Sequence, residues 1–529
     1  MAANLPGDLS AVGASDVERI IEPASAVTAK KKQKKKKPKK KATVGTEAEA
    51  SLEISEAINA SAALEKLKLD QTNISDSLIT NGGPRNGNGN GNGKPTFWDT
   101  QPVPKDYDSS LPDGPIRPRP KLGPDELPPA EKLLDGFEWA TLDLREPVQL
   151  SSLTSLLQSH YVSDPHSTFR LHYTSAFLRW ALFAPSSTVL THPPSSSPAS
   201  INSTSTLSRN EGNPLHFSVL SPSGKPLAFL SGTPHLLRVR TATLLTCSID
   251  FLCIHSRLRL KRLAPVLMRE LKRRCAYPGG ESIGAGVYSA GVELSPPLAS
   301  CRYYHRPLKW EKLQKVGFVD WEMNGERKYR VANISLPRCR EMQEKDVEAV
   351  TSLFSRYLER FEMAPIMNSD EVRHWFLGDS SNGDAGRKFG DRIVWAYVVE
   401  SPEGKITDFY SFYKLESSVI GSGGEMVNAA YWFYYASEAA WEGKENFGAR
   451  LNEIMQDALG RMKKLGFDVL NALTLMDNTL FLKQQKFIPG DGLLHYYLYN
   501  WRTAPIQGGI TTEGELDTEG GSGIGLVML

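Results

Sequence analysis

The last residues of the chain carry a carboxylate that could take part in chemistry. The sequence ends in Gly525-Leu526-Val527-Met528-Leu529, whereas chain ends are commonly polar and poorly ordered. Burial of these apolar side chains would carry the α-carboxylate of Leu529 inside with them. A buried carboxylate is costly unless another group uses it or pairs with it. We therefore treat this end as a candidate functional group, with a terminal strand that completes a sheet as the alternative.

A second candidate site lies where a predicted strand runs into a basic turn. Residues 243–254 have the composition of a buried strand, and a helix with one apolar face is expected from Leu263. Helix N-termini bind anions through free backbone N–H groups, and arginine adds charge-assisted hydrogen bonds to phosphate. This arrangement suits the phosphates of coenzyme A, and a solvated basic helix start is the alternative. The basic residues of the turn are Arg257, Arg259, Lys261 and Arg262.

The sequence lacks the motifs of several other kinds of enzyme. It contains no Walker A motif, no HExxH motif and no GxSxG elbow, which argues against nucleotide triphosphate hydrolysis, a zinc site of that kind and a serine hydrolase. The five cysteines show no CxxC spacing and are expected to be reduced thiols in a cytosolic protein. His305 and His374 each stand alone, so we expect no metal site.

Composition and charge limit the class of protein further. The 529 residues are 40% apolar, which is sufficient for a sizeable core, and the length allows two or three domains. No apolar run is long enough to span a membrane, and the N-terminus has neither a secretory pattern nor Gly at position 2. Residues 1–94 carry 15 Lys and Arg against 11 Asp and Glu, so the rest of the chain is mildly acidic. This distribution does not favour a dedicated nucleic-acid-binding domain.

Low-complexity segments mark the expected limits of the folded part. Residues 30–41 are almost entirely lysine and residues 81–94 are rich in Gly and Asn, so residues 1–94 are predicted to form a disordered arm. The lysine run is either a solubilising tail or nuclear signal, or a segment that docks on ribosomal RNA or another polyanion. A Ser/Thr/Pro-rich stretch, 185–213, is typical of a loop insertion.

Between these segments, strand patterns alternate with helix patterns. Residues 393–399 are predicted to form a buried strand, and 342–361 and 447–465 to form helices with one apolar stripe. Gly466 stands where a helix C-cap is expected. The mixture predicts an α/β or α+β fold.

Ordered blocks of the sequence resemble one enzyme family. The blocks are FWDTQPVP (97–104), FLCIHSRLRLKRLAP (251–265), YSAG (288–291), CRYYHR (301–306), TDFYSFY (407–413), FIPGDG (487–492), YYLYNW (496–501) and GLVML (525–529). Through them the chain resembles the fungal glycylpeptide N-tetradecanoyltransferases, that is, the N-myristoyltransferases. The resemblance runs from about Phe97 to Leu529.

The resemblance implies a fold and a reaction. Two acetyltransferase-like (GNAT-like) halves, related by pseudo-twofold symmetry, would share a twisted mixed sheet flanked by helices. Residues 95–325 would bind the acyl-CoA, and residues 326–529 would supply most of the peptide groove and end in the catalytic carboxylate. The implied reaction transfers myristate from myristoyl-CoA to the N-terminal glycine amine of a protein. Myristoyl-CoA is then the acyl-donor substrate, and no permanently bound cofactor or metal is expected.

The resemblance also assigns catalytic roles to individual residues. The backbone amides of Phe251 and Leu252 would form an oxyanion hole for the thioester oxygen. The carboxylate of Leu529 would accept a proton from the glycine amine, which is mostly protonated at neutral pH. Ser289, where relatives commonly have Thr, would lie beside that amine and keep a hydrogen bond to it.

Binding residues follow from the same resemblance. The acyl-CoA would contact Phe97, Trp98, Asp250, Phe251, Leu252, Cys253, Ile254, Arg257, Leu258, Arg259, Leu260, Lys261, Arg262, Leu263 and Ala264. The peptide would contact Tyr161, Phe169, Ser289, His305, Tyr410, Asp491, Gly492 and Leu529. The expected partners are N-terminal-glycine peptides, nascent proteins and, through the lysine-rich arm, the ribosome. We expect a cytoplasmic monomer that has no membrane span and binds no DNA.

Some positions depart from the family pattern. Asp250 replaces the usual Asn beside the oxyanion hole, and its charge would favour an ammonium and oppose deprotonation. Leu260 replaces a Ser that often helps to bind phosphate, and the loop 161–166 has lost acidic residues, which predicts a weaker preference for lysine in the substrate. Two alternatives stay open: a catalytically weak paralogue that binds acyl-CoA or nascent chains, and a related N-acyltransferase that uses another acyl chain.

Overall fold

The computed structural model describes residues 97–105, 112–118, 128–163, 168–185, 213–276, 283–320, 322–332, 334–378 and 392–529. The predicted arm, 1–94, and nearly all of the predicted insertion, 185–213, lie outside these residues. All of the described residues belong to one compact unit, Glu53–Leu529. Among them, no helix is both long enough and apolar enough to cross a membrane.

One mixed sheet of 13 strands organises the described residues. Its strands are β2 (Glu138–Thr141), β4 (His216–Leu220), β5 (Pro226–Val239), β6 (Ala242–Ile254), β7 (Ala285–Ala290), β8 (Ala299–Pro307), β9 (Cys339–Glu341), β10 (Met363–Ile366), β11 (Val394–Glu400), β12 (Ile406–Lys414), β15 (Ala429–Ser437), β16 (Val469–Leu473) and β17 (Ile488–Tyr499). Two small sheets pair β1 (Gly114–Pro115) with β18 (Trp501–Arg502), and join β3 (Phe169–His172), β13 (Glu416–Val419) and β14 (Met426–Val427).

The strand order repeats from the two edges of the large sheet towards its middle. From one edge it runs β2-β4-β5-β6-β7-β17, and from the other β9-β11-β12-β15-β16-β8. In each series the fourth and fifth strands, β6 with β7 and β15 with β16, form the parallel pair. β8 and β17 pair with each other at the centre, so each half of the chain contributes its last strand to the other half. This order supports the expected relationship between two halves of similar topology.

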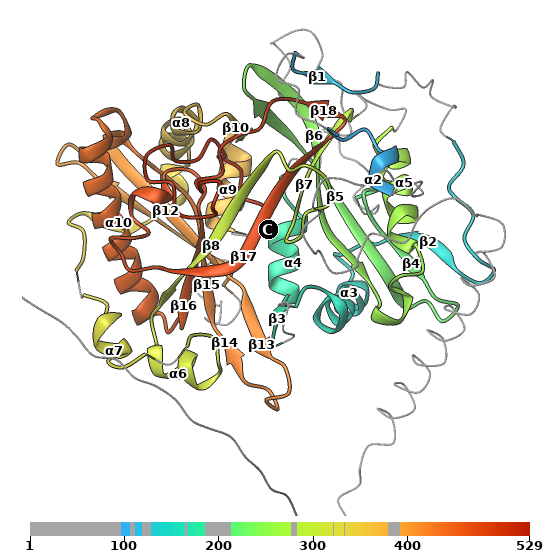
Figure 1. Cartoon of the computed structure of the whole chain (residues 1–529), viewed down its shortest axis with the longest axis horizontal. Helices are drawn as coiled ribbons and strands as arrows, with labels where there is room; N and C mark the ends of the chain where they lie inside the picture. Colours follow the sequence, from blue (N-terminus) through green and yellow to red (C-terminus); the bar gives the residue numbers. More distant parts are fainter. Residues whose placement is uncertain are drawn as a thin grey trace, which may run out of the picture. The chain divides into compact units, whose positions relative to one another are not determined.

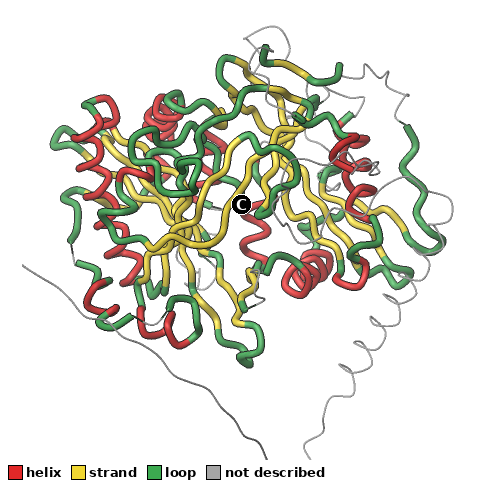
Figure 2. Tube along the Cα trace, viewed as in Figure 1, coloured by secondary structure: helices red, strands yellow, loops and turns green. Residues whose placement is uncertain are grey.

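Helices follow the strands at matching places in the two series. The longer helices are α3 (Pro147–His160), α4 (Ser175–Leu182), α5 (Leu263–Cys275), α8 (Val347–Leu358), α9 (Ser369–Leu377) and α10 (Lys444–Lys464), and the short ones are α2 (Phe97–Thr100), α6 (Trp310–Lys315) and α7 (Gly325–Lys328). α5 connects β6 to β7, and α10 connects β15 to β16, as crossovers between parallel strands require. Figure 1 shows α5 beside the strands of one half and α10 beside those of the other, and Figure 2 shows the same helices in red around the yellow strands.

The sequence patterns account for most of these elements. β6, β11, α5 and α10 confirm the predicted strands and helices, and Gly466 directly after α10 has the φ of +86° that favours glycine. The predicted helix over 342–361 is wrong at its start and at its end. Residues 344–346 form a 3₁₀ turn, and the α-helix is limited to Val347–Leu358. A mixed α/β fold with a twisted sheet and flanking helices is confirmed.

Candidate active site

An irregularity in β6 takes the backbone at Phe251 out of regular pairing. Phe229 faces Cys253 and Ser231 faces Asp250, so Phe251 and Leu252 together stand opposite a single residue of β5. This is a β-bulge, and Phe251 has a φ of +53°, which is uncommon for a bulky side chain. Strained backbone of this kind is concentrated at functional sites.

The pairing of β6 with β7, its neighbour on the other side, ends close to the same point. β6 and β7 are paired only from Thr246 to Ser248, although β6 continues to Ile254 and β7 to Ala290. The two parallel strands therefore separate before the bulge, and backbone groups of β6 that would bond to β7 have no strand beside them. The backbone at Phe251 instead forms a hydrogen bond to the hydroxyl of Tyr161.

The second half of the sheet repeats this arrangement with one difference. Phe433 and Tyr434 of β15 together stand opposite Ser411 of β12, and the pairing of β15 with β16 stops at Tyr431. Here the bulge is satisfied internally, because the Tyr434 N–H donates to Ser411 Oγ at 3.2 Å and that hydroxyl donates to the Tyr434 carbonyl at 2.7 Å. At the first bulge the hydroxyl of Ser231 on β5 donates to the Asp250 carbonyl at 3.0 Å, one residue before Phe251.

The end of the chain lies between the two bulges. The Val527 N–H donates to the hydroxyl of Tyr434 at 3.0 Å, and the hydroxyl of Tyr496 donates to the Leu526 carbonyl at 3.0 Å. Upstream, the Gly525 N–H donates to the Met363 carbonyl at 2.7 Å. Figure 1 marks this end between the two sets of strands. Hydrogen bonds thus hold the chain until two residues before its end.

Two glycines let this segment approach its neighbours closely. A Cβ atom at Gly523 would come within 2.6 Å of a side-chain carbon of Ile506, and one at Gly525 within 3.0 Å of the Phe361 ring. Larger residues would push the segment away from the core. The Gly-rich sequence before the apolar end therefore permits burial, and Ile524, Leu526 and Met528 are buried in the structure.

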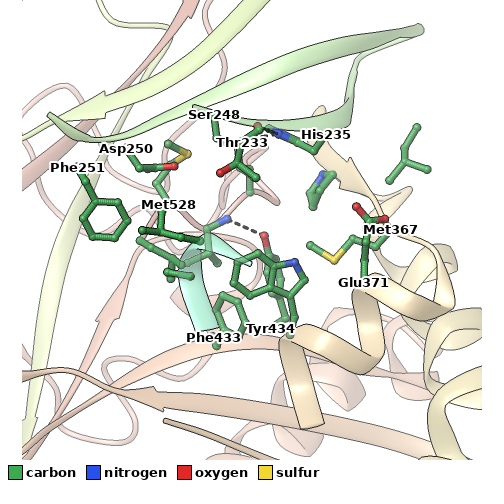
Figure 3. Close-up of a pocket in the computed structure, with 18 residues that line it drawn as sticks. Thr233, His235, Ser248, Asp250, Phe251, Met367, Glu371, Phe433, Tyr434 and Met528 are labelled. Atoms are coloured by element: carbon green, nitrogen blue, oxygen red, sulfur yellow. Dashed lines mark hydrogen bonds between the residues drawn. The ribbon is translucent and has the colours of Figure 1, made fainter. Parts of the chain in front are cut away.

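Leu529 and the bulge line one cavity. Figure 3 shows Asp250 and Phe251 on one side of it, Glu371 on the opposite side, and Phe433 and Tyr434 below. Burial raises the pKa of Asp250 to about 7 and lowers the pKa of His235 to about 4. The lining residues are Ala181, Leu182, Thr233, His235, Ser248, Asp250, Phe251, Pro365, Ile366, Met367, Glu371, Trp375, Phe433, Tyr434, Leu526, Val527, Met528 and Leu529.

The basic turn after β6 lies at the start of α5, as predicted. Leu260 and Arg262 both have left-handed backbone, with φ of +63° and +61°. Arg259 is held by hydrogen bonds to the carbonyls of Ile254 and His160. Leu260 is 64% exposed, and Arg257 is also exposed, so a ligand can reach the turn. The side chains of Cys253, Leu258 and Leu263 are buried in the core, whereas Leu252, Ile254, Lys261 and Ala264 are half-buried.

Phe97 and Trp98 are buried beside a second cavity. Trp98 stacks on Tyr288 with ring centroids 5.4 Å apart, and Tyr288 stacks on Tyr497 at 5.0 Å. Next to this stack lies a largely apolar cavity of about 360 Å³ between α5, β6 and β7. Its lining includes Cys247, Ile249, Met268, Leu271, Gly286 and Tyr499. Cys247 and Ile249 alternate along β6 with Ser248 and Asp250, so the two cavities lie on opposite faces of this strand.

The residues predicted to bind peptide fall into three places. Tyr161 lies at the bulge, with its ring 6.0 Å from that of Phe251, and Ser289 is paired with Tyr496, which holds the chain end. Phe169 and His305 both contact the ring of Phe318. Asp491 and Gly492 lie near them, because a Cβ atom at the preceding residue, Gly490, would reach within 2.3 Å of His305.

Tyr410 is not brought together with these residues. It is fully buried, and its hydroxyl donates to Asp457 of α10. Its neighbour in the block, Tyr413, does line a small cavity that also includes Val527 and Met528. No sequence pattern indicated Tyr434, which holds the chain end, or Ser411 and His235. Their positions depend on strand register far along the chain, which no local pattern records.

Two family descriptions match the chain. Myristoyl-CoA:protein N-myristoyltransferase, N-terminal domain, matches residues 124–192 and 211–301, and the C-terminal domain of the same description matches residues 320–527. The chain belongs to the N-myristoyltransferase family. It is accordingly an acyltransferase, and every strand of the large sheet except most of β8 falls within the matched regions.

Curated relatives and solved structures agree with this assignment. The chain is 40% identical to the glycylpeptide N-tetradecanoyltransferase of Aspergillus fumigatus, over 91% of this chain and 94% of the relative, and 38% identical to that of Neurospora crassa, over 88% and 77%. It is similar to a crystal structure of Saccharomyces cerevisiae N-myristoyltransferase with bound myristoyl-CoA, with a TM-score of 0.72 and 34% identity. That match covers 82% of this chain and 99% of the yeast chain.

Proposed function

We propose that this protein transfers myristate from myristoyl-CoA to N-terminal glycine amines by direct attack at the bulge of β6, with the α-carboxylate of Leu529 as the base. One observation carries the proposal: Phe251 and Leu529 line the same cavity. Membership of the family supplies the reaction class. The names of the relatives supply the glycine peptide and the acyl chain.

The bulge supplies electrostatic stabilisation. As the amine attacks, the thioester oxygen becomes negatively charged, and backbone N–H groups aimed at it lower the barrier by a few kcal/mol. The amides of Phe251 and Leu252 are the proposed donors, because the bulge and the separation of β6 from β7 take them out of regular pairing. The hydroxyl of Tyr161 forms a hydrogen bond to the Phe251 backbone in this structure. In the reaction, the thioester oxygen of the substrate would replace this hydroxyl as the partner of the backbone.

The proton balance requires a base. The incoming ammonium must lose one proton before it can attack, and the Leu529 carboxylate accepts it. A C–N bond then forms and the C–S bond breaks. The second proton of the nitrogen ends on the sulfur of coenzyme A, so the products are the amide, the free thiol and one proton on the carboxylate. Ser289, next to the chain end through Tyr496, would orient the amine.

The apolar cavity on the other face of β6 would take the acyl chain. Its lining along Cys247 and Ile249 leads towards the bulge, about 13 Å from Cys247 to Phe251 at the rise of a strand. The strand separation beside Phe251 would let the thioester pass from one face to the other. The coenzyme A phosphates would then lie at the basic turn, where Arg257, Arg259, Lys261 and Arg262 meet the start of α5.

A single-turnover assay tests the proposal. The full-length protein is loaded with radiolabelled acyl-CoA of different chain lengths and mixed with a peptide that begins with Gly, or with the same peptide beginning with Ala. We expect labelled amide only with the Gly peptide, and fastest with the C14 chain. Faster transfer of another chain would favour a different acyltransferase, and binding without transfer would favour a paralogue that only binds acyl-CoA.

The lysine-rich arm is proposed to bind the ribosome, and the protein to work in the cytoplasm. The support is the density of lysine in residues 30–41. Deletion of residues 1–80 is expected to spare transfer to soluble peptides and to reduce co-sedimentation with ribosomes. Unchanged co-sedimentation would rule out this role.

A further inference from the structure

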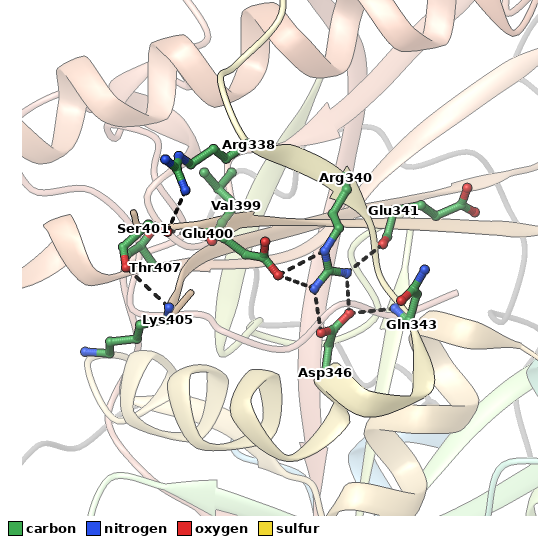
Figure 4. Close-up of polar contacts among 10 residues, drawn as sticks. All are labelled: Arg338, Arg340, Glu341, Gln343, Asp346, Val399, Glu400, Ser401, Lys405 and Thr407. Atoms are coloured by element: carbon green, nitrogen blue, oxygen red, sulfur yellow. Dashed lines mark hydrogen bonds and ion pairs between the residues drawn. The ribbon is translucent and has the colours of Figure 1, made fainter. Parts of the chain in front are cut away.

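Most buried carboxylates of the described residues have a cationic partner. Asp408 pairs with Arg450, Asp457 with Arg461, and Glu270 with both Arg273 and Arg274. Figure 4 shows the same for Asp346, which receives two hydrogen bonds from Arg340, at 2.6 and 2.8 Å. These arginines lower the pKa of Asp346 and Glu270. Such pairing is what allows a charge to remain inside a protein.

Asp250 is different. Its carboxyl has no ion pair or hydrogen bond with any other residue that the structure describes, and Asp250 lines the cavity. No Lys or Arg is among the 18 residues that line that cavity. The carboxyl groups that do line it are Asp250, Glu371 and the chain end at Leu529. Glu371 lies across the cavity and accepts a hydrogen bond from the Asn368 N–H at 2.9 Å.

The other titratable groups around Asp250 supply no positive charge. His235 of β5 is neutral at physiological pH, because burial lowers its pKa. Tyr161, after α3, is an acid whose pKa is raised by burial and by Asp250. Cys247, three residues earlier on β6, is an acid whose pKa is raised by its hydrogen bond with Cys275, by burial and by Asp250. Two negative charges in one enclosed space without a cation repel each other strongly, and a carboxyl pair then retains one proton.

We propose that Asp250 holds this proton, so that its side chain adds no negative charge beside the Leu529 carboxylate. Asp250 is then a positioning residue: it sets the charge beside the proposed base and takes no part in the transfer itself. The contacts favour Asp250 over Glu371 as the protonated group, because Glu371 accepts a hydrogen bond from the Asn368 N–H, which stabilises its charged form, whereas no such bond to Asp250 is found among the described residues. The inference rests on the proposed role of Leu529.

A negatively charged Asp250 would oppose deprotonation of the substrate amine, and protonation of Asp250 removes this effect. A neutral carboxylic acid adds no attraction for an ammonium, so the amine can be deprotonated as it would be beside an amide. When the pH rises through about 7, Asp250 ionises. The cavity then gains a further negative charge, which binds the ammonium form of the peptide more tightly and holds its proton more firmly.

Infrared difference spectroscopy tests the protonation directly. Spectra of the full-length protein are recorded from about pH 5 to about pH 9 for the wild type and Asp250→Asn, and the two series are subtracted. We expect a carboxylic-acid C=O band that disappears with a midpoint near pH 7 in the wild type and is missing from Asp250→Asn. The control is Glu371→Gln, which changes the other carboxyl of the cavity and should keep the band. Asp250→Ser replaces Asp250→Asn if the latter fails to fold.

Steady-state kinetics over the same range test the consequence. Below about pH 6 the ratios of the wild-type kcat and KM to those of Asp250→Asn, measured with a Gly peptide, should not change with pH. Above about pH 8 both ratios should be several-fold lower. Absence of the infrared band overturns the proposal. The proposal is also overturned if the band is present but the kinetic parameters of the wild type and Asp250→Asn depend on pH in the same way. If the Leu529 carboxylate proved not to be the base, the infrared titration would remain, so the two failures can be told apart.

Discussion

Phe251 of β6 and Tyr434 of β15 occupy matching bulges in the two halves of the sheet, and both line the cavity that holds the end of the chain. The two bulges differ in their hydrogen bonds. Tyr434 is bonded to Ser411 and, through its hydroxyl, to Val527. The Phe251 backbone is bonded to the hydroxyl of Tyr161. The bulge of β15 thus helps to hold the chain end, while the bulge of β6 is the proposed site of the thioester oxygen.

Replacement of a backbone N–H at the bulge should slow acyl transfer. Incorporation of an α-hydroxy acid at position 251 or 252 converts that amide into an ester and removes a single proposed donor. We expect single-turnover transfer to fall about 10²–10³-fold, with the affinity for acyl-CoA little changed. The measurement is a rapid-quench assay on the protein loaded with acyl-CoA.

The control for this experiment is Phe251→Leu, which changes the side chain and keeps the N–H. It should transfer the acyl chain at close to the wild-type rate, because the proposed role belongs to the backbone. A loss as large as that of the ester would show that the ring of Phe251, packed on Tyr161 and Tyr173, carries the effect instead.

Gly286→Val should shorten the preferred acyl chain. A Cβ atom at Gly286 would lie 3.4 Å from Ile249 and 3.5 Å from Tyr499, so the two added methyl groups extend into the apolar cavity. We expect about tenfold lower kcat/KM with a C14 chain and a smaller loss with C12, since a methylene is worth about 1–3 kcal/mol in such a pocket. A panel of acyl-CoA donors measures this.

The opposite change, Ile249→Val, should favour longer chains. Equal losses for every chain length in Gly286→Val would contradict this assignment of the cavity.

Arg257→Gln should weaken the binding of acyl-CoA in a salt-dependent way. Arg257 is exposed in the basic turn, and a charged hydrogen bond to phosphate is worth about 1.5–3 kcal/mol. Isothermal titration with a non-hydrolysable acyl-CoA should show roughly tenfold weaker binding at low salt and a smaller difference at high salt. Lys483→Gln, which removes an exposed charge from another turn, serves as the control. Equal effects of the two changes would show that only the net charge of the protein matters.

Asp250→Asn should change how stability depends on pH. The pKa of Asp250 is raised from 3.8 to about 7, so the unfolded chain gives up this proton first and the free energy of unfolding falls as pH rises between these values. The decrease in the free energy of unfolding caused by Asp250 is absent below about pH 4 and complete above about pH 7, where it reaches at most about 4 kcal/mol. Urea unfolding of the variant and the wild type should therefore diverge with rising pH. A constant difference from about pH 4 to about pH 8 would show that Asp250 titrates normally.

The sequence predicted those parts of the fold that local periodicity determines. β6, β11 and α10 have apolar patterns that persist over a whole element. The start of the helix near residue 342 was wrong because Met342 bonds to Ala396 in the neighbouring strand, which no helical pattern records. The basic turn was predicted from its charge and from the strand and helix patterns on either side of it.

The sequence could not assign faces within the buried strands. β12 is buried along nearly its whole length, so polarity does not separate Tyr410, which bonds to α10, from Tyr413, which lines a cavity. The positions of Tyr434 and Ser411 depend on a register shift between β12 and β15. The apolar end of the chain could be recognised from the sequence, because an apolar terminus is unusual.

The most direct test of the whole account neutralises the final carboxylate. Protein ligation can join a synthetic C-terminal segment that ends in Leu529 as either the free acid or the amide, so that the two proteins differ in a single charged group. Single-turnover transfer to a Gly peptide is then measured on both. We predict that the amide binds acyl-CoA normally and transfers the chain about 10²–10⁴-fold more slowly. Transfer at the full rate by the amide would contradict the account.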